Sequence, residues 1–193
     1  MASPLDAAAL DQIWRAARTH RSWSSRPVPE TLLREMTELA QWAPSASNLQ
    51  PARIVYVTSD AGKARLRPHL SAGNVERAMS APVIAIIGHD LRFFENVPKG
   101  LEPAKGFADK PEAAAVAALR NGSLQGAYLM LAARALGLDV GPMSGFDNAG
   151  VDAEFFAGTE TKSNFLCNIG YGDGQGMRPR GPRFAFDEIA RIV

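Results

Sequence analysis

An uninterrupted apolar run at residues 82–88, Pro-Val-Ile-Ala-Ile-Ile-Gly, constrains the fold of this 193-residue chain more than any other stretch. A strand with one face in water alternates apolar and polar side chains, whereas a strand covered on both faces is apolar throughout. The run is short, rich in β-branched residues and bounded by proline and glycine, which favours a strand over a buried helix. We therefore predict a central strand in a sheet that is covered on both faces.

Helices and further strands are predicted on both sides of this run. Apolar spacing predicts a helix at residues 5–19, with a stripe of Leu10, Ile13, Trp14 and Ala17, and a second helix from Pro29 to Pro44, with Leu32, Leu33, Met36, Leu39 and Ala40 buried. Shorter helices are predicted around Leu66 and at residues 151–156, and a long apolar helix at residues 111–136, stopped by Gly137. Strands at residues 53–58, 139–142 and 164–170 complete one mixed α/β domain over residues 1–193.

Composition argues against several classes of function. The 21 basic and 20 acidic residues leave a net charge of +1, so no global field attracts nucleic acid or an anionic membrane. The single cysteine, Cys167, forms no intramolecular disulfide, and no Cys/His cluster has the spacing of a metal site. The long helix contains too many polar residues for a membrane span, and residues 1–6 lack the pattern of a secretory signal. We expect a cytoplasmic protein without a metal site.

No motif supplies a reactive side chain. The three histidines have no carboxylate or cysteine at the spacing of a triad or dyad, and neither a GxSxG elbow nor a phosphate-binding glycine loop follows a predicted strand. An enzyme with this sequence would therefore take its reactive centre from a cofactor.

Two basic clusters are candidates for holding the phosphate of such a cofactor. Residues 20–26 combine His20, Arg21 and Ser22 with further hydroxyl groups, a mixture that suits a phosphate monoester. An exposed basic cap on the preceding helix is the alternative, and composition alone favours it. Arginines at residues 178–183, held extended by prolines, match phosphate oxygens, with a solvated basic tail as the alternative.

Two further clusters are candidates for contact with a planar ring. Residues 42–51, Trp-Ala-Pro-Ser-Ala-Ser-Asn-Leu-Gln-Pro, place amides and hydroxyls between a helix and a strand, although a loop of Asx and Ser turns is the better explanation of this cluster alone. Glycines in residues 137–147 let backbone N–H groups approach a ligand, and a tight turn is equally compatible. Together, the four clusters contain what a phosphorylated planar cofactor requires.

The ordered set of motifs resembles the nitroreductase family. The matching segments are His20-Arg21-Ser22, Pro27-Val28-Pro29-Glu30, residues 42–51, Ala72-Gly73-Asn74, residues 135–138, residues 141–147 and Arg183, which span almost the whole chain. The resemblance implies an α+β fold, with a central mixed, mainly antiparallel sheet flanked by helices, in a homodimer of the domain-swapped type. It also implies FMN as cofactor, NADH or NADPH as electron donor, and ping-pong hydride transfer through flavin N5 to a small-molecule acceptor, without an obligatory side-chain acid or base.

The resemblance carries over to particular residues at the phosphate end of the cofactor. His20, Arg21 and Ser22 match the phosphate and ribityl end of the FMN site, joined by Arg77 and by Arg180 or Arg183. His20 and a shortened segment before Pro27 depart from the family's usual pattern, which has arginine at this first position.

Around the flavin ring, the resemblance implies two groups of contacts. Asn74 matches the contact to the pyrimidine edge, and Pro142, Met143, Ser144 and Gly145 match the turn behind the ring, with a backbone N–H near flavin N5. Pro44, Ser45, Ser47 and Asn48 match residues that reach the flavin of the other subunit. The complete site would therefore exist only in the dimer.

A narrower resemblance is to the malonic semialdehyde reductase branch, which shares the strings at residues 138–147 and 168–173. It implies reduction of malonic semialdehyde to 3-hydroxypropionate in uracil degradation. The alternatives are a broad-specificity nitroreductase or quinone reductase, a flavin carrier or sensor with little turnover, and an α/β domain without flavin. We expect residues 89–110 to form a mobile segment near the site, with Phe93, Phe94 and Phe107 as either a lid or buried anchors.

Overall fold

A computed structural model describes residues 3–99, 102 and 104–193. Its centre is a four-stranded sheet in the order β1-β2-β4-β3, formed by β1 (Ala52–Val57), β2 (Val83–Asp90), β4 (Thr161–Gly170) and β3 (Asp139–Met143). Every neighbouring pair of these strands is antiparallel, and one parallel bridge, between Thr19 and Val140, continues the edge beyond β3. This is the mainly antiparallel sheet that the family resemblance implies.

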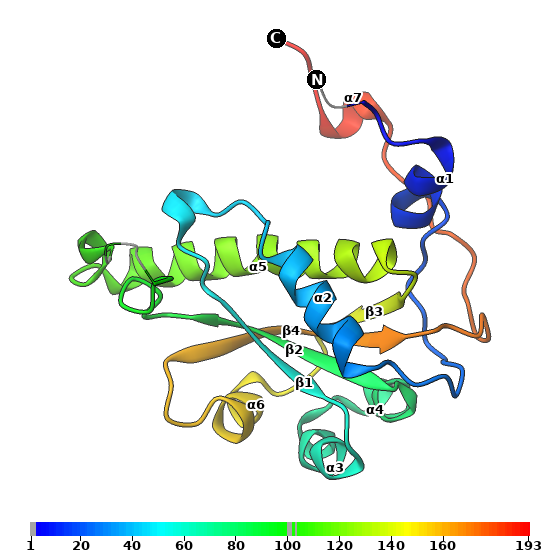
Figure 1. Ribbon diagram of the computed structural model, residues 1–193, viewed down its shortest axis with the longest axis horizontal. Coiled ribbons are helices and arrows are strands. Elements are labelled where there is room, and N and C mark those ends of the chain that lie inside the picture. Colours follow the sequence, from blue (N-terminus) through cyan, green and yellow to red (C-terminus); the bar gives the residue numbers. More distant parts are fainter. Residues whose placement is uncertain (1–2, 100–101, 103) are drawn as a thin grey trace.

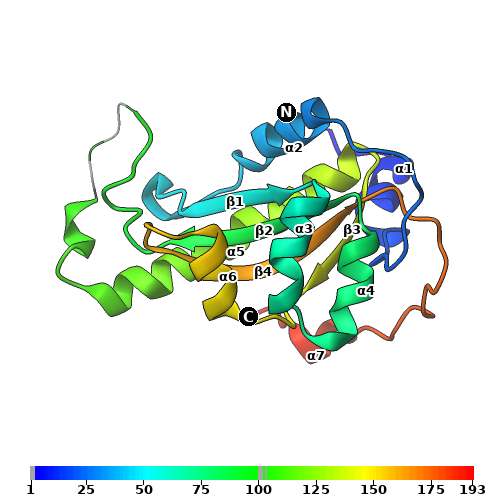
Figure 2. The same ribbon diagram turned by 90° about the horizontal axis from the view of Figure 1, so that it is seen from below.

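Helices cover both faces of the sheet (Figure 1). The long helix α5 (Pro111–Ala135) and α2 (Glu30–Ala40) lie on one face. Figure 2 shows α3 (Asp60–Leu66), α4 (Ala72–Ser80) and α6 (Asn148–Phe155) on the other face. Shorter helical segments are α1 (Ala7–Leu10), a π-helix at Asp11–Arg15, 3-10 turns at Ala46–Asn48, Arg67–His69 and Lys105–Phe107, and α7 (Phe186–Ile189). Within the described ranges, none of the helices has the length and apolar character needed to cross a membrane.

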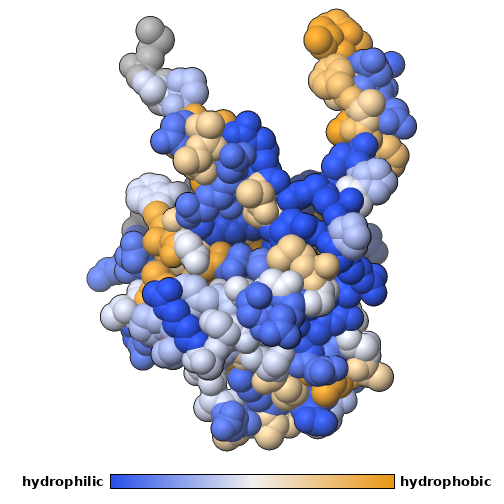
Figure 3. Space-filling view, turned by 90° about the vertical axis from the view of Figure 1, so that its right-hand side faces the viewer, coloured by the Kyte–Doolittle hydropathy of each residue, from blue (hydrophilic) through white to orange (hydrophobic). Residues whose placement is uncertain are grey.

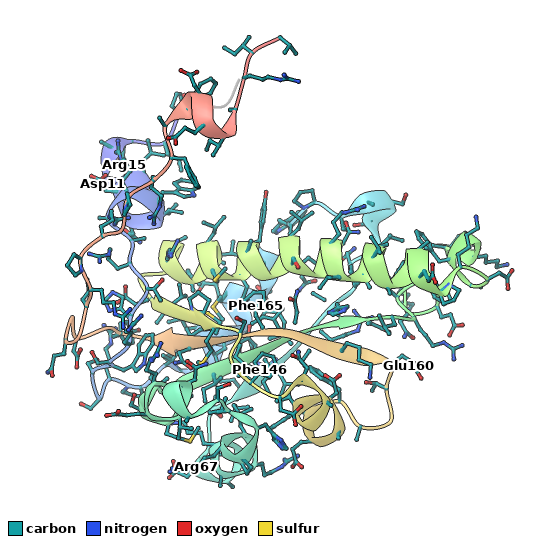
Figure 4. The ribbon with its side chains drawn as sticks, turned by 180° about the vertical axis from the view of Figure 1, so that it is seen from behind. Asp11, Arg15, Arg67, Phe146, Glu160 and Phe165 are labelled. Carbon is teal, nitrogen blue, oxygen red and sulfur yellow. The ribbon has the colours of Figure 1, made fainter. Side chains whose placement is uncertain are left out.

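The two-sided cover explains the apolar run in β2, whose eight residues are all buried. Val83, Ala85 and Ile87 pack in the cluster that includes α2 and α5, whereas Ile84 and Ile86 pack in a second cluster on the opposite face. Figure 4 shows the same division, because Phe165 of β4 points toward α5 while Phe146 lies on the other side of the sheet. The predicted central strand is confirmed.

Two glycines bring α5 unusually close to the sheet. A Cβ atom on Gly122 would lie 2.8 Å from the Cβ of His89, and one on Gly126 would lie 2.7 Å from Cζ of Phe165. Because Gly122 and Gly126 are one helical turn apart, both lie on the buried side of the helix and leave room there for the side chains of the sheet.

Three predictions about helices need correction. The first helical segment covers residues 7–15 rather than 5–19, and it buries none of its stripe, since Trp14 is 49% exposed. In α2, Leu39 is exposed, because Leu33, Met36 and Ala40 form a narrow buried stripe and Leu39 lies at its edge. Helix α4 was not predicted, because Gly73 and Asn74 in its first turn are typical of turns.

The aromatic residues of the 89–110 segment act as buried anchors. Phe93 is fully buried, and it packs edge-on against Phe94 and Phe107 with ring centroids 5.6 and 5.1 Å apart. Residues 100, 101 and 103 of this segment lie outside the described residues. In the described part, the anchor alternative therefore replaces the lid.

Candidate functional site

The basic turn at residues 20–26 is joined by hydrogen bonds to the edge of the sheet. The backbone N–H of His20 donates to the Val140 carbonyl at 3.0 Å, and that of Ser24 donates to the Tyr171 carbonyl at 2.8 Å. Trp23, which is buried, forms an antiparallel bridge with Gly172. The turn is thus held between β3 and the segment that follows β4.

His20 faces the protein rather than a cavity. Its Nε2 lies 3.2 Å from Oδ1 of Asp139, and only 11% of the side chain is exposed. The imidazole occupies the space that a Cβ on Gly172 would need, and the Gly172 N–H donates to the second Asp139 oxygen at 2.9 Å. The departure from the family's arginine is therefore accommodated by an acidic partner and a glycine.

Ser22 is likewise bound within the chain. Its hydroxyl lies within hydrogen-bond distance of the Asp173 carboxylate and 2.7 Å from the Gln175 carbonyl oxygen. The hydrogen bond from Ser22 lowers the pKa of Asp173. The hydroxyl orders the start of the C-terminal segment in this arrangement.

Arg21 is the member of the turn that meets other cations. The pKa of its guanidinium is lowered, first by desolvation and then by the charges of Arg178 and Arg77. None of these three arginines takes part in an ion pair among the described residues. Positive charges without an ion-pair partner attract anions, so these arginines are candidates for binding one.

A pocket of about 320 Å³ adjoins this cluster. Its described lining has no acidic side chain and contains Trp14, Ala17, Thr19, Pro179 and Gly181 together with the arginines Arg18, Arg21, Arg134, Arg178, Arg180 and Arg183. Arg180 donates to the carbonyl oxygens of Arg15 and Ala17 at 2.8 and 3.0 Å, which fixes the C-terminal segment against the first helical segment. Both basic clusters predicted from the sequence thus line one cavity.

Arg178 belongs to the basic segment predicted from composition, but the family resemblance names only Arg180 and Arg183. Nothing in the sequence distinguishes it from Arg180 and Arg183. The structure distinguishes them. The positive charge of Arg178 acts on Arg21, whereas the Arg180 guanidinium donates hydrogen bonds to backbone carbonyls.

The turn after β3 is fixed by α4. Nδ2 of Asn74 donates to the Gly145 carbonyl at 2.8 Å, and the Ser71 N–H donates to the same oxygen at 3.1 Å. Arg77 lies one helical turn after Asn74, and its carbonyl accepts from Nδ2 of Asn168 at 3.0 Å. One helix therefore connects the arginine cluster to the turn at Ser144 and Gly145. Pro142 and Met143, which were expected in this turn, are the last two residues of β3 and pair with Cys167 and Leu166 of β4.

The loop of residues 42–51 lies at the opposite end of the sheet. Asp90, the last residue of β2, donates its N–H to the Pro51 carbonyl at 2.8 Å, whereas Val83 at the other end pairs with Ile169 next to Val140. At about 3.3 Å per residue, β2 separates the two regions by roughly 20 Å. A single chain does not bring Pro44, Ser45, Ser47 and Asn48 to the other candidate residues.

The polar residues of this loop face outward. Pro44, Ser47 and Asn48 are exposed and Ser45 is half-buried, whereas Leu49 is buried. Ser47, Asn48 and Gln50 have φ angles of 48°, 56° and 44°, the only positive values at non-glycine positions among the described residues. Backbone strain of this kind gathers at functional sites.

The fold and the arrangement of the site define a family. The model of the nitroreductase family matches residues 14–171, and the chain belongs to this family. A protein of Stenotrophomonas maltophilia (strain K279a), provisionally named NADH dehydrogenase/NAD(P)H nitroreductase, is 60% identical over 197 residues, with 100% of both chains covered.

Solved structures share the fold. The enone reductase CLA-ER of gut-bacterial fatty acid saturation matches with a TM-score of 0.85 and 20% identity, over 98% of this chain and 100% of its own. A nitroreductase-type protein of Exiguobacterium sibiricum 255-15, solved in complex with FMN, matches with a TM-score of 0.80 and 21% identity, over 100% of this chain and 99% of its own. The predicted nitroreductase-like α+β fold is confirmed.

Proposed function

We propose that this chain is an FMN-dependent NAD(P)H oxidoreductase that works as a homodimer. The observation that carries the proposal is the pocket that six arginines line, Arg21 and Arg178 among them, with no acidic side chain in its described lining. Arg77 of α4, whose charge also acts on Arg21, follows Asn74, which is bound to the turn at Gly145. The NAD(P)H nitroreductase name of the Stenotrophomonas relative and the FMN in the Exiguobacterium structure support this choice of cofactors.

The residues present fit FMN at both of its ends. A phosphate monoester carries up to two negative charges, which the arginine cluster would balance, and arginine forks match its oxygens. Asn74 donates from Nδ2 to Gly145, so its Oδ1 is left to accept a hydrogen bond from the edge of a ring. Backbone groups of the turn at Ser144 and Gly145 would lie behind that ring.

FMN, when bound, supplies the capacity to take two electrons from NAD(P)H and to pass them to an acceptor. The side chains of this chain bind and orient. Arg21, Arg77 and Arg178 would hold the phosphate, joined by Arg180 or Arg183, while His20 and Ser22 keep the turn that carries Arg21 in place.

The homodimer is supported by apolar surfaces that one chain leaves exposed. The solvent side of α5 carries Val116, Leu119, Leu124 and Tyr128, all at least 38% exposed. The C-terminal arm, residues 184–193, stands away from the body of the molecule, and Figure 3 shows hydrophobic groups at its tip and along one side, next to hydrophilic ones. Its exposed large apolar residues are Phe184, Phe186, Ile189, Ile192 and Val193. Burial of these surfaces against a second copy would bring its 42–51 loop to the site.

Malonic semialdehyde is the acceptor that we propose. The strings at residues 138–147 and 168–173, which carry the resemblance to its reductases, supply Asp139, Gly141 and Gly172. These three residues surround His20, the position at which the chain departs from the wider family. The unusual histidine and the two strings therefore form one structural unit.

Broad-specificity reduction of nitroaromatics is the second candidate, favoured by the name of the Stenotrophomonas relative. The two are distinguished by kcat/KM for malonic semialdehyde and for a nitroaromatic, measured with the same preparation and donor. We expect the aldehyde to give the higher value; a nitroaromatic preference would reject malonic semialdehyde.

The visible spectrum of the gently purified protein tests the proposal as a whole. We expect a yellow protein that NADH or NADPH bleaches without air and that malonic semialdehyde then restores. A colourless protein that binds no added FMN would reject the cofactor. A yellow protein that neither donor bleaches would be a flavin carrier or sensor.

A further inference from the structure

The strained 42–51 loop must be held by contacts from outside its own backbone. Each residue in the left-handed region costs about 1 kcal/mol or more when it is not glycine. Ser47, Asn48 and Gln50 all adopt this region within four residues. Without anchors, the loop would relax to commoner backbone angles.

Two buried amides of α5 anchor the loop on either side of these residues. Oδ1 of Asn121 accepts a hydrogen bond from the Ala46 N–H at 2.8 Å, and Oε1 of Gln125 accepts one from the Ala52 N–H at 2.9 Å. Asn121 is 3% exposed and Gln125 is 6% exposed. A buried polar group that lacks a partner costs about 1–3 kcal/mol, so each of these buried side-chain oxygens favours the loop conformation that supplies its N–H donor.

The orientation of the Asn121 amide is itself fixed. Its Nδ2 donates to the Ala117 carbonyl at 2.8 Å, which leaves Oδ1 directed at the loop. Further contacts hold the loop between the two amides, because Leu49 packs against Phe93 and Ala118, and Arg53 donates to the Gln50 carbonyl at 3.1 Å.

The four-residue spacing of Asn121 and Gln125 explains how one helix makes two hydrogen bonds to the loop. Residues 121–126 read Asn-Gly-Ser-Leu-Gln-Gly, so an amide followed by a glycine recurs after one helical turn. Gly122 and Gly126 let α5 approach the sheet, and Asn121 and Gln125 are thereby brought to the loop that enters β1.

We infer that Asn121 and Gln125 are positioning residues, which hold the loop so that its exposed residues Ser47 and Asn48 face the flavin of a second chain. The role toward the flavin rests on the proposed function, whereas the hold on the loop does not. The role that we assign to both amides toward the cofactor is exerted through the loop.

Amide hydrogen exchange of the full-length protein without FMN tests the hold. In Asn121→Leu and Gln125→Leu, we expect the amides of residues 44–52 to exchange at least tenfold faster, while exchange in β2 is unchanged. Gln125→Glu retains an acceptor oxygen and should keep the slow exchange. Asn148→Ala serves as the control for general loss of stability. Asn148 is in α6, on the other face of the sheet, and its side chain donates hydrogen bonds to Ser163 of β4 that the substitution removes.

FMN affinity of the same variants tests the role toward the flavin. We expect Asn121→Leu and Gln125→Leu to weaken FMN binding about tenfold, and Asn148→Ala to leave it unchanged at a similar loss of thermal stability. Unchanged exchange at residues 44–52 in both leucine variants would overturn the inference, as would faster exchange with unchanged FMN affinity. A wild-type protein that binds no FMN would overturn the proposed function and with it the role toward the flavin, whereas the hold on the loop would stand, because the exchange comparison uses no flavin.

Discussion

Asn74 and Gly145, which are 71 residues apart in the sequence, are joined by a 2.8 Å hydrogen bond from the side-chain amide to the backbone carbonyl. The bond fixes the first turn of α4 to the turn after β3, and a Cβ on Gly145 would lie only 2.6 Å from Nδ2 of Asn74. Any side chain at position 145 would therefore displace the amide that we assign to the flavin ring.

Gly145→Ala should accordingly weaken FMN binding at least tenfold and destabilise the protein by about 1–3 kcal/mol, the usual cost of overpacking. FMN titration and thermal unfolding measure the two effects. Gly73→Ala is the control. Gly73 is next to Asn74 in α4, a Cβ there meets nothing within 4 Å, and alanine is the better helix former. Equal FMN affinity in both variants would contradict the assignment of this turn.

Arg178→Gln should weaken FMN binding about tenfold or more, since hydrogen bonds to charged groups contribute about 1.5–3 kcal/mol. It should also reduce the dependence of FMN affinity on salt, because one cation of the cluster is lost. Titrations at low and high salt measure both. Arg67→Gln is the control, because Arg67 is exposed beside α3, away from the cluster (Figure 4). Loss of affinity in both variants alike would argue against a phosphate site at Arg178.

Acid should destabilise the protein partly through His89. Burial lowers the pKa of this histidine, so the unfolded chain binds a proton at a pH where the folded chain does not. The contribution of His89 to stability is therefore complete above the ordinary histidine pKa of about 6.5, and it is lost as the pH falls below that value. Each pH unit within this window changes the free energy of unfolding by at most about 1.4 kcal/mol.

His89→Gln should narrow the difference in unfolding free energy between pH 8 and pH 5 relative to the wild type. Urea unfolding at both pH values measures this difference. His69→Gln, in the 3-10 turn that follows α3, is the control for the replacement of a histidine by glutamine. The same pH dependence in wild type and His89→Gln would contradict the role of the buried imidazole.

Gly122→Ala should destabilise the protein by about 1–3 kcal/mol, although alanine is favoured over glycine in a helix by about 1 kcal/mol. The added methyl group would clash with the side chain of His89 and push α5 from the sheet. Gly106→Ala, where a Cβ meets nothing within 4 Å, should change stability little. Chemical unfolding compares the two variants, and equal stability would show that α5 tolerates a wider spacing.

The elements that could be predicted are those whose environment leaves a local trace in the sequence. β2 is buried on both faces, and the residues of the run are therefore apolar throughout. α5 ends where predicted because Gly137 adopts a φ of 77°, a conformation that glycine adopts without strain. In both cases a few consecutive residues determine the structure.

The elements that could not be predicted depend on distant partners. The apolar stripe that includes Trp14 was expected in a core, yet Trp14 is half exposed in one chain. His20 is predicted at a phosphate, and only the fold shows that Asp139, far along the sequence, lies 3.2 Å from its imidazole. Asn121 and Gln125 interrupt an apolar helix in the sequence, and only the fold shows that they face the 42–51 loop.

The roughly 20 Å between the arginine cluster and the 42–51 loop has a genetic consequence. In the proposed homodimer, each site takes its arginines from one chain and its loop from the other. A gene copy altered at Arg178 and a second copy altered at Asn48 would each encode an inactive protein alone. A cell that expresses both copies would assemble mixed dimers in which one site carries both defects and the other carries neither, so the two recessive alleles would complement each other.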